Sequence, residues 1–176
     1  MRMDIAAIAL GIALAGAPAF ADDPAPVPDA AGDYASLQQI ELTDDEVSRY
    51  VGSLDDMQNA MGDVAADATE PDARTMAKLE SVAKKHGFRN FDEYNNVAGN
   101  ISLVVDGIDP DTKTYVGQDT LIQKGLDELK ADPKMTGADK ETATRDLEAQ
   151  LKTIVPIKYK THIDLVVKRY DQINGG

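Results

Sequence analysis

The sequence contains no cysteine. Without thiols, the protein has no disulfide framework, no thiolate metal site, no cysteine nucleophile, no attachment point for c-type haem and no cysteine-linked lipid anchor. Histidine is scarce as well, with only His86 and His162 in 176 residues. Neither has a second histidine at metal-ligand spacing, and one histidine cannot build a zinc site. We therefore expect a structural or surface role for both.

Sequence motifs of the common enzyme classes are also missing. There is no G-x-S-x-G nucleophile elbow, no P-loop and no G-x-G-x-x-G fingerprint. Carboxylates are plentiful, but neighbours such as Asp55 and Asp56 do not face each other on a helix. The sequence therefore predicts no catalytic residue, no metal ligand and no cofactor, and we expect the protein not to be an enzyme.

Long apolar runs are lacking too. The most apolar stretch, Ile5 to Ala17, contains two glycines and falls short of the roughly 20 residues that a membrane-spanning helix needs. Arg2 precedes this stretch, and Ala19-Phe20-Ala21 offers the small residues that a signal peptidase reads. We predict that residues 1–21 are a signal peptide cleaved after Ala21, and that the protein reaches the periplasm with no membrane span.

Basic residues are rare in the first third of the remaining chain. Residues 22–72 hold 14 acidic residues and one basic residue, Arg49, whereas residues 73–176 hold 16 of each sign. The formal charge of −13 therefore arises in the first of these segments. Nucleic acids and anionic membranes are polyanions, so the acidic balance argues against both as partners, and we expect no nucleic-acid binding. The acidic residues either serve solubility or form a surface for a cationic partner.

Two segments follow the signal peptide. Residues 22–33 consist mainly of proline, alanine and aspartate, which predicts a disordered leader. Residues 34–174 carry helical periodicity and are long enough for one domain with a sizeable core. We therefore predict a single helical domain over 34–174.

Apolar residues at three- and four-residue steps predict the helices of this domain. The first runs to Ala68, and Thr43 and Glu46 at its start have the T-x-x-E spacing of a capping box. No segment alternates with period two over the length of a strand. The pattern predicts an all-α fold of five to six amphipathic helices in a bundle or an orthogonal array. The other helices are expected to begin near Pro71, Asn90, Leu121, Thr136 and Thr161.

The C-terminal helix is expected to lie beside the first. Five basic residues lie between Lys152 and Gly176, opposite in charge to the aspartates of the first helix. Exposed ion pairs are weak, so burial of Val166, Val167 and Tyr170 must supply most of the stabilisation.

A calcium site is one alternative that the acidic residues raise. Asp106, Asp109 and Asp111, with Asp119 nearby, supply the carboxylate oxygens that Ca²⁺ prefers. An EF-hand loop beginning at Asp109 would need an oxygen ligand, glycine and glutamate where the chain has Lys113, Thr114 and Thr120. We therefore interpret Asp109-Pro110-Asp111 as a turn.

A haem-binding bundle is the second alternative. Exported b-type cytochromes take a methionine from the first helix and a histidine from the last. This chain has Met57 and Met61 in its first helix and His162 in its last. Methionine at helical spacing is more often a packing residue, and axial ligands must project into a shared core.

Three segments carry a resemblance to a known group. They are Leu42-Thr43 followed by Asp44 to Val51, the pattern His86-Gly87-Phe88-x-x-Phe91-x-x-Tyr94-x-x-Val97 with Asn100-Ile101, and Val166 to Ile173. Together they resemble small exported helical proteins of proteobacteria, an uncharacterised domain family. The resemblance implies the fold and the compartment and carries no activity.

These observations favour a non-enzymatic periplasmic protein that binds another periplasmic protein or protects one under stress. The alternative is a small-ligand or cofactor carrier, with haem or calcium as the ligands that the sequence suggests.

Overall fold

The computed structural model describes residues 34–62 and 71–175. The predicted signal peptide, the predicted leader and the last turns of the first predicted helix lie outside these ranges. The described part is mostly helical, as the sequence predicted. It also contains one short antiparallel strand pair, which the sequence analysis missed.

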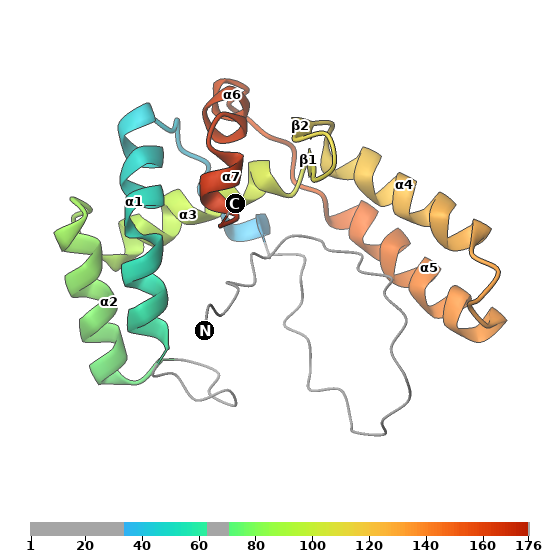
Figure 1. Cartoon of the computed structure of the whole chain (residues 1–176), viewed down its shortest axis with the longest axis horizontal. Coiled ribbons are helices and arrows are strands. Elements are labelled where there is room, and N and C mark those ends of the chain that lie inside the picture. The colour runs from blue at the N-terminus through green and yellow to red at the C-terminus, as the bar shows by residue number, and fades with distance from the viewer. Residues whose placement is uncertain (1–33, 63–70, 176) are drawn as a thin grey trace.

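Helices α1 (Asp44–Met61) and α2 (Ala73–Lys85) lie side by side and antiparallel, and α3 (Phe91–Val105) runs across them (Figure 1). Each of the three helices is preceded by a residue whose side chain accepts a hydrogen bond from an amide of the first turn. These N-cap residues are Thr43, Asp72 and Asn90. Gly87 follows α2 at a φ of +85° and turns the chain, so that Phe88 folds back into the core. Local sequence signals thus set the starts of all three helices.

The predicted capping box is present at Thr43. The Thr43 hydroxyl accepts from the Glu46 amide at 3.2 Å, and the Glu46 carboxylate accepts from the Thr43 amide at 2.8 Å. Thr43→Ala should lower the free energy of unfolding by about 1 kcal/mol, because a first-turn amide loses its partner. The urea midpoint measures this loss. Thr142→Ala, at an exposed position inside helix α5 (Gly137–Thr153), is a suitable control and should not lower the midpoint.

No strand was predicted between α3 and the next helix. In the structure, β1 (Ile108–Asp109) and β2 (Thr114–Tyr115) pair antiparallel, with Ile108 opposite Tyr115. Two residues per strand are too few to produce a period-two pattern, so a strand pair of this length leaves no recognisable pattern in the sequence. Helix α4 (Gln118–Ala131) follows and begins three residues before the expected Leu121.

The expected C-terminal helix is divided into α6 (Thr161–Val167) and α7 (Tyr170–Ile173). Both contact α1, as the sequence predicted. The Arg169 guanidinium lies 2.7 Å from the Asp44 carboxylate and 3.0 Å from the Ser48 hydroxyl. Val166 is fully buried and Val167 partly buried, so Val166 is the main apolar contact of the pair.

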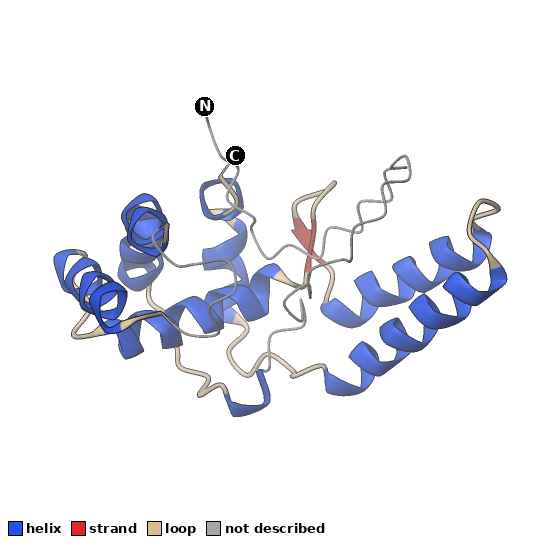
Figure 2. Ribbon diagram, turned by 90° about the horizontal axis from the view of Figure 1, so that it is seen from below, coloured by secondary structure: helices blue, strands red, loops and turns tan. Residues whose placement is uncertain are grey.

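The buried core lies between α1, α2, α3 and the α6–α7 segment. Among the described residues, no side chain of α4 or α5 (Gly137–Thr153) belongs to it. These two helices pack on each other and project from the rest as a helical hairpin (Figure 2). The fully buried apolar residues of the core are Val47, Leu79, Ala83, Val97, Ile101, Val104 and Val166.

Candidate functional site

His162 is buried and serves as a hydrogen-bond acceptor. Its Nε2 accepts from the Leu42 amide at 2.8 Å, and its ring stacks on Tyr159 with the ring centroids 5.2 Å apart. Burial lowers the pKa of His162, which favours the neutral ring that this bond requires. A haem iron at Nε2 would have to break this hydrogen bond. Of the two candidate methionine ligands, Met57 is buried and Met61 is 43% exposed. This geometry does not favour the haem alternative.

His86 belongs to a small charged cluster at the end of α2. Its Nε2 and the Lys85 ammonium both lie 2.7 Å from the same oxygen of Asp56. The bond from Lys85, followed by that from His86, lowers the pKa of Asp56. The cluster connects α1 to the end of α2 and has the character of a surface ion pair.

The calcium candidates do not converge on a common point. One Asp109 oxygen accepts from the amides of Asp111 and Thr112, which is the turn that the sequence predicted. The other oxygen lies 3.3 Å from the Lys124 ammonium. The bond from the Thr112 amide is the main cause that lowers the pKa of Asp109. Within residues 34–62 and 71–175, no three metal-binding side chains gather. The geometry therefore does not favour a calcium site at this turn.

Asp106 has a different environment from the other aspartates of this segment. It follows the last turn of α3, and its Oδ2 accepts from the Tyr34 hydroxyl at 2.8 Å and from the Gln118 side-chain amide at 3.1 Å. Burial raises the pKa of Asp106 to about 6, and these two hydrogen bonds oppose the rise. In the sequence, Asp106 was one of the calcium candidates. No sequence pattern indicated that its carboxylate joins Tyr34 to Gln118 at the start of α4.

Residues 34–43, which we call the arm, form a short 3₁₀ turn (η1, Tyr34–Ser36) and an extended segment leading to α1. Side chains from distant parts of the chain hold its backbone. The buried Asn100 donates to the Gln38 carbonyl at 3.1 Å and accepts from the Ile40 amide at 3.2 Å. Asn96 and His162 also bond the backbone of the arm. The side chain of Gln39, which belongs to the arm, bonds the Pro156 carbonyl and the Lys158 amide.

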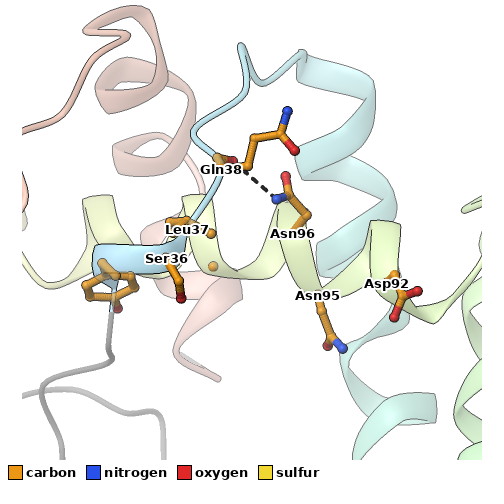
Figure 3. Close-up of a pocket in the computed structure, with 8 residues that line it drawn as sticks. Ser36, Leu37, Gln38, Asp92, Asn95 and Asn96 are labelled. Carbon is orange, nitrogen blue, oxygen red and sulfur yellow. Dashed lines mark hydrogen bonds between the residues drawn. The ribbon is translucent and has the colours of Figure 1, made fainter.

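A hollow of about 430 Å³ lies between the arm and α3 (Figure 3). Asn96 bonds the Gln38 carbonyl at 3.2 Å across one side of the hollow. Asp92 and Asn95 are exposed on α3. Among the residues that the structure describes, no lysine, arginine or histidine lines the hollow, and its other lining residues there are Tyr34, Ser36, Leu37 and Gly99.

A second cleft, of about 330 Å³, lies between α4 and α5. Most of its exposed surface is apolar. Helix α5 has no fully buried residue, so the apolar side chains that it turns toward α4 remain partly accessible. The cleft is lined by Gly125, Leu129, Met135, Ala143 and Leu147, with the exposed carboxylates Glu128 and Asp146.

Comparison with protein-family models, curated proteins and solved structures finds no match to this chain. None of the described helices combines the length and apolar character needed to cross a membrane.

Proposed function

We propose that this chain is a non-catalytic periplasmic protein-binding domain, and that the α4–α5 hairpin carries its binding surface. The observation that best supports this proposal is the apolar cleft of the hairpin. Its volume falls within the usual range for ligand clefts. Because the hairpin packs on itself and projects from the core, this apolar surface is accessible without any rearrangement of the core.

The charges around the cleft indicate the kind of partner. Glu128 and Asp146 line it, and among the described contacts neither forms an ion pair. A partner segment that inserts a bulky apolar side chain between Leu129 and Leu147, beside a lysine or arginine, would match both features. We therefore assign the cleft to a basic, amphipathic segment of another protein.

A fluorescein-labelled amphipathic peptide built from leucine and lysine tests this assignment. Fluorescence anisotropy should show binding to the intact protein, and Ala143→Leu should weaken it by about tenfold or more by filling the cleft. Replacing both cleft carboxylates, with Glu128→Gln and Asp146→Asn, should also weaken binding and reduce its salt dependence.

The matched control removes the same charge from another face of the hairpin. Glu141 and Glu148 are exposed on α5 and do not line the cleft. Their double replacement by glutamine should leave peptide affinity nearly unchanged. If both double variants lost peptide affinity equally, binding would depend only on the net charge of the protein. That result would overturn the proposal. Self-association that Ala143→Leu abolishes would instead identify a second copy of the chain as the occupant.

A further inference from the structure

His162 holds the point at which the arm enters α1. Its ring is 2% exposed in the first turn of α6, and its Nε2 accepts from the Leu42 amide at 2.8 Å. Leu42 is itself buried and directly precedes Thr43, the N-cap residue of α1. One histidine ring therefore joins two segments that lie 120 positions apart in the sequence.

The direction of this hydrogen bond makes it depend on the protonation state of the ring. A backbone amide can only donate, so Nε2 must carry a lone pair and the ring must be neutral, with its hydrogen on Nδ1. A protonated ring carries a hydrogen on both nitrogens and has no acceptor left. Two donors would then face each other between two buried residues, His162 and Leu42. Because neither donor would have a partner, the contact is lost in that state.

The middle of the arm is held by a side chain that does not ionise. Asn100 donates to the Gln38 carbonyl at 3.1 Å and accepts from the Ile40 amide at 3.2 Å. A carboxamide keeps both its donor and its acceptor at any pH near neutrality. The hold on Ile40 and the hold on Leu42 should therefore respond differently to acid.

We propose that His162 is an acid-sensitive clasp, which holds Leu42 at the entrance to α1 while its ring is neutral and releases it when the ring is protonated. Asn100 holds the middle of the arm in both states. Release gives the Leu42 side chain, which belongs to the buried core, access to water beside the start of α1. The inference concerns the arm and does not depend on what the hairpin cleft binds.

The surroundings of the ring act on its protonation in opposite directions. Burial opposes protonation, whereas two carboxylates favour it, Glu41 from the arm and Glu46 from α1. The charges beside the ring in residues 158–164 are exposed. The other titratable side chains on the elements that contact α6 include Asp92 and Glu93 in the first turn of α3, Tyr115 of β2, the stacked Tyr159, and Asp44 paired with Arg169.

The sign of the pH dependence follows from proton linkage. In the closed clasp, burial lowers the pKa of His162 from the ordinary value of 6.5, and the two carboxylates only partly offset this effect. The open clasp returns the ring to water, so it binds the proton more tightly than the closed clasp. The advantage of the closed clasp is therefore complete above the ordinary pKa and decreases as the pH falls below it. From about pH 7.5 to about pH 5, the open fraction should rise about tenfold.

Hydrogen exchange of two arm amides tests the clasp within one protein. From about pH 7.5 to about pH 5, the protection factor of the Leu42 amide should fall about tenfold. The protection factor of the Ile40 amide, which bonds Asn100, should change by less than about twofold. An unchanged protection factor at Leu42, or an equal fall at both amides, would overturn the proposal.

Two matched variants assign the effect to one ring. His162→Gln supplies an acceptor that does not titrate and should remove the pH dependence at Leu42. His86→Gln removes the only other histidine and should retain it. Asp106, at the other end of the arm, also titrates in this range, with a pKa of about 6, and it is intact in both variants. An equal fall at Leu42 in His162→Gln would contradict the clasp.

A second measurement needs no variant. In the folded protein, the ring resonances of His162 should titrate with a midpoint below the ordinary value of 6.5, and the Leu42 amide resonance should shift with the same midpoint. A midpoint at or above the ordinary value, or a Leu42 resonance that does not follow the ring, would show that the clasp is not closed in solution. Either result would overturn the proposal.

Discussion

Val166→Asp is expected to unfold the core. Val166 is fully buried on α6, where α6 packs against α3 and α1. A carboxylate at this position would lie in apolar surroundings, at a cost of more than about 4 kcal/mol. That cost is comparable with the whole stability of many domains, about 5–15 kcal/mol. Circular dichroism should show loss of helix, or a strongly lowered melting temperature.

Three further variants define the origin of this loss of stability. Val166→Ala removes only part of the buried side chain and should cost about 2 kcal/mol. Lys168→Ala alters an exposed residue of the same segment and should change stability by less than about 0.5 kcal/mol. Val167 is only partly buried, so Val167→Asp should be less severe than Val166→Asp. A stable, helical Val166→Asp protein would show that the α6–α7 segment is not part of the core.

Asn100→Ala should produce the next largest loss, about 2–4 kcal/mol. The side chain is 2% exposed, and it bonds the Gln38 carbonyl, the Ile40 amide and the Asn96 carbonyl. Alanine would leave the Ile40 amide without a partner in a partly buried position. Urea unfolding measures the loss, and faster hydrogen exchange at Ile40 would locate it in the arm.

Asn95→Ala is the matched control for this prediction. It removes the same amide group from an exposed position on the same helix, and it should change stability by less than about 0.5 kcal/mol. Equal effects of the two variants would contradict a specific role for Asn100 in holding the arm.

The helices were predictable because their signals are local. A capping box needs residues three positions apart, and an amphipathic stripe needs residues within two turns. The contact between α1 and the C-terminal helices was also predictable, since charge and apolar pattern both favoured it. The separation of the α4–α5 hairpin from the core was not, because α4 carries the same apolar periodicity whether it packs on the core or on α5 alone.

The candidate sites were predictable only in part. The turn at Asp109 followed from adjacent residues, but the lysine that pairs with it lies 15 positions away. The contacts of the arm join residues 58 to 120 positions apart, and no sequence pattern specifies such pairs. One signal was available, namely Asn100 within the apolar stripe of α3. A polar residue on an apolar helix face indicates a buried hydrogen-bonding role.

The projecting hairpin has a mechanical consequence. Its 14-residue helix α4 begins at Gln118, the residue that Asp106 holds, and ends at the far turn. A helix of that length extends about 21 Å. A rotation of roughly 10° at the base would therefore move the far turn by about 4 Å, on the geometry of a rigid helix. The hairpin acts as a lever, so a change too small to disturb the core would still displace the far turn by about the length of a side chain.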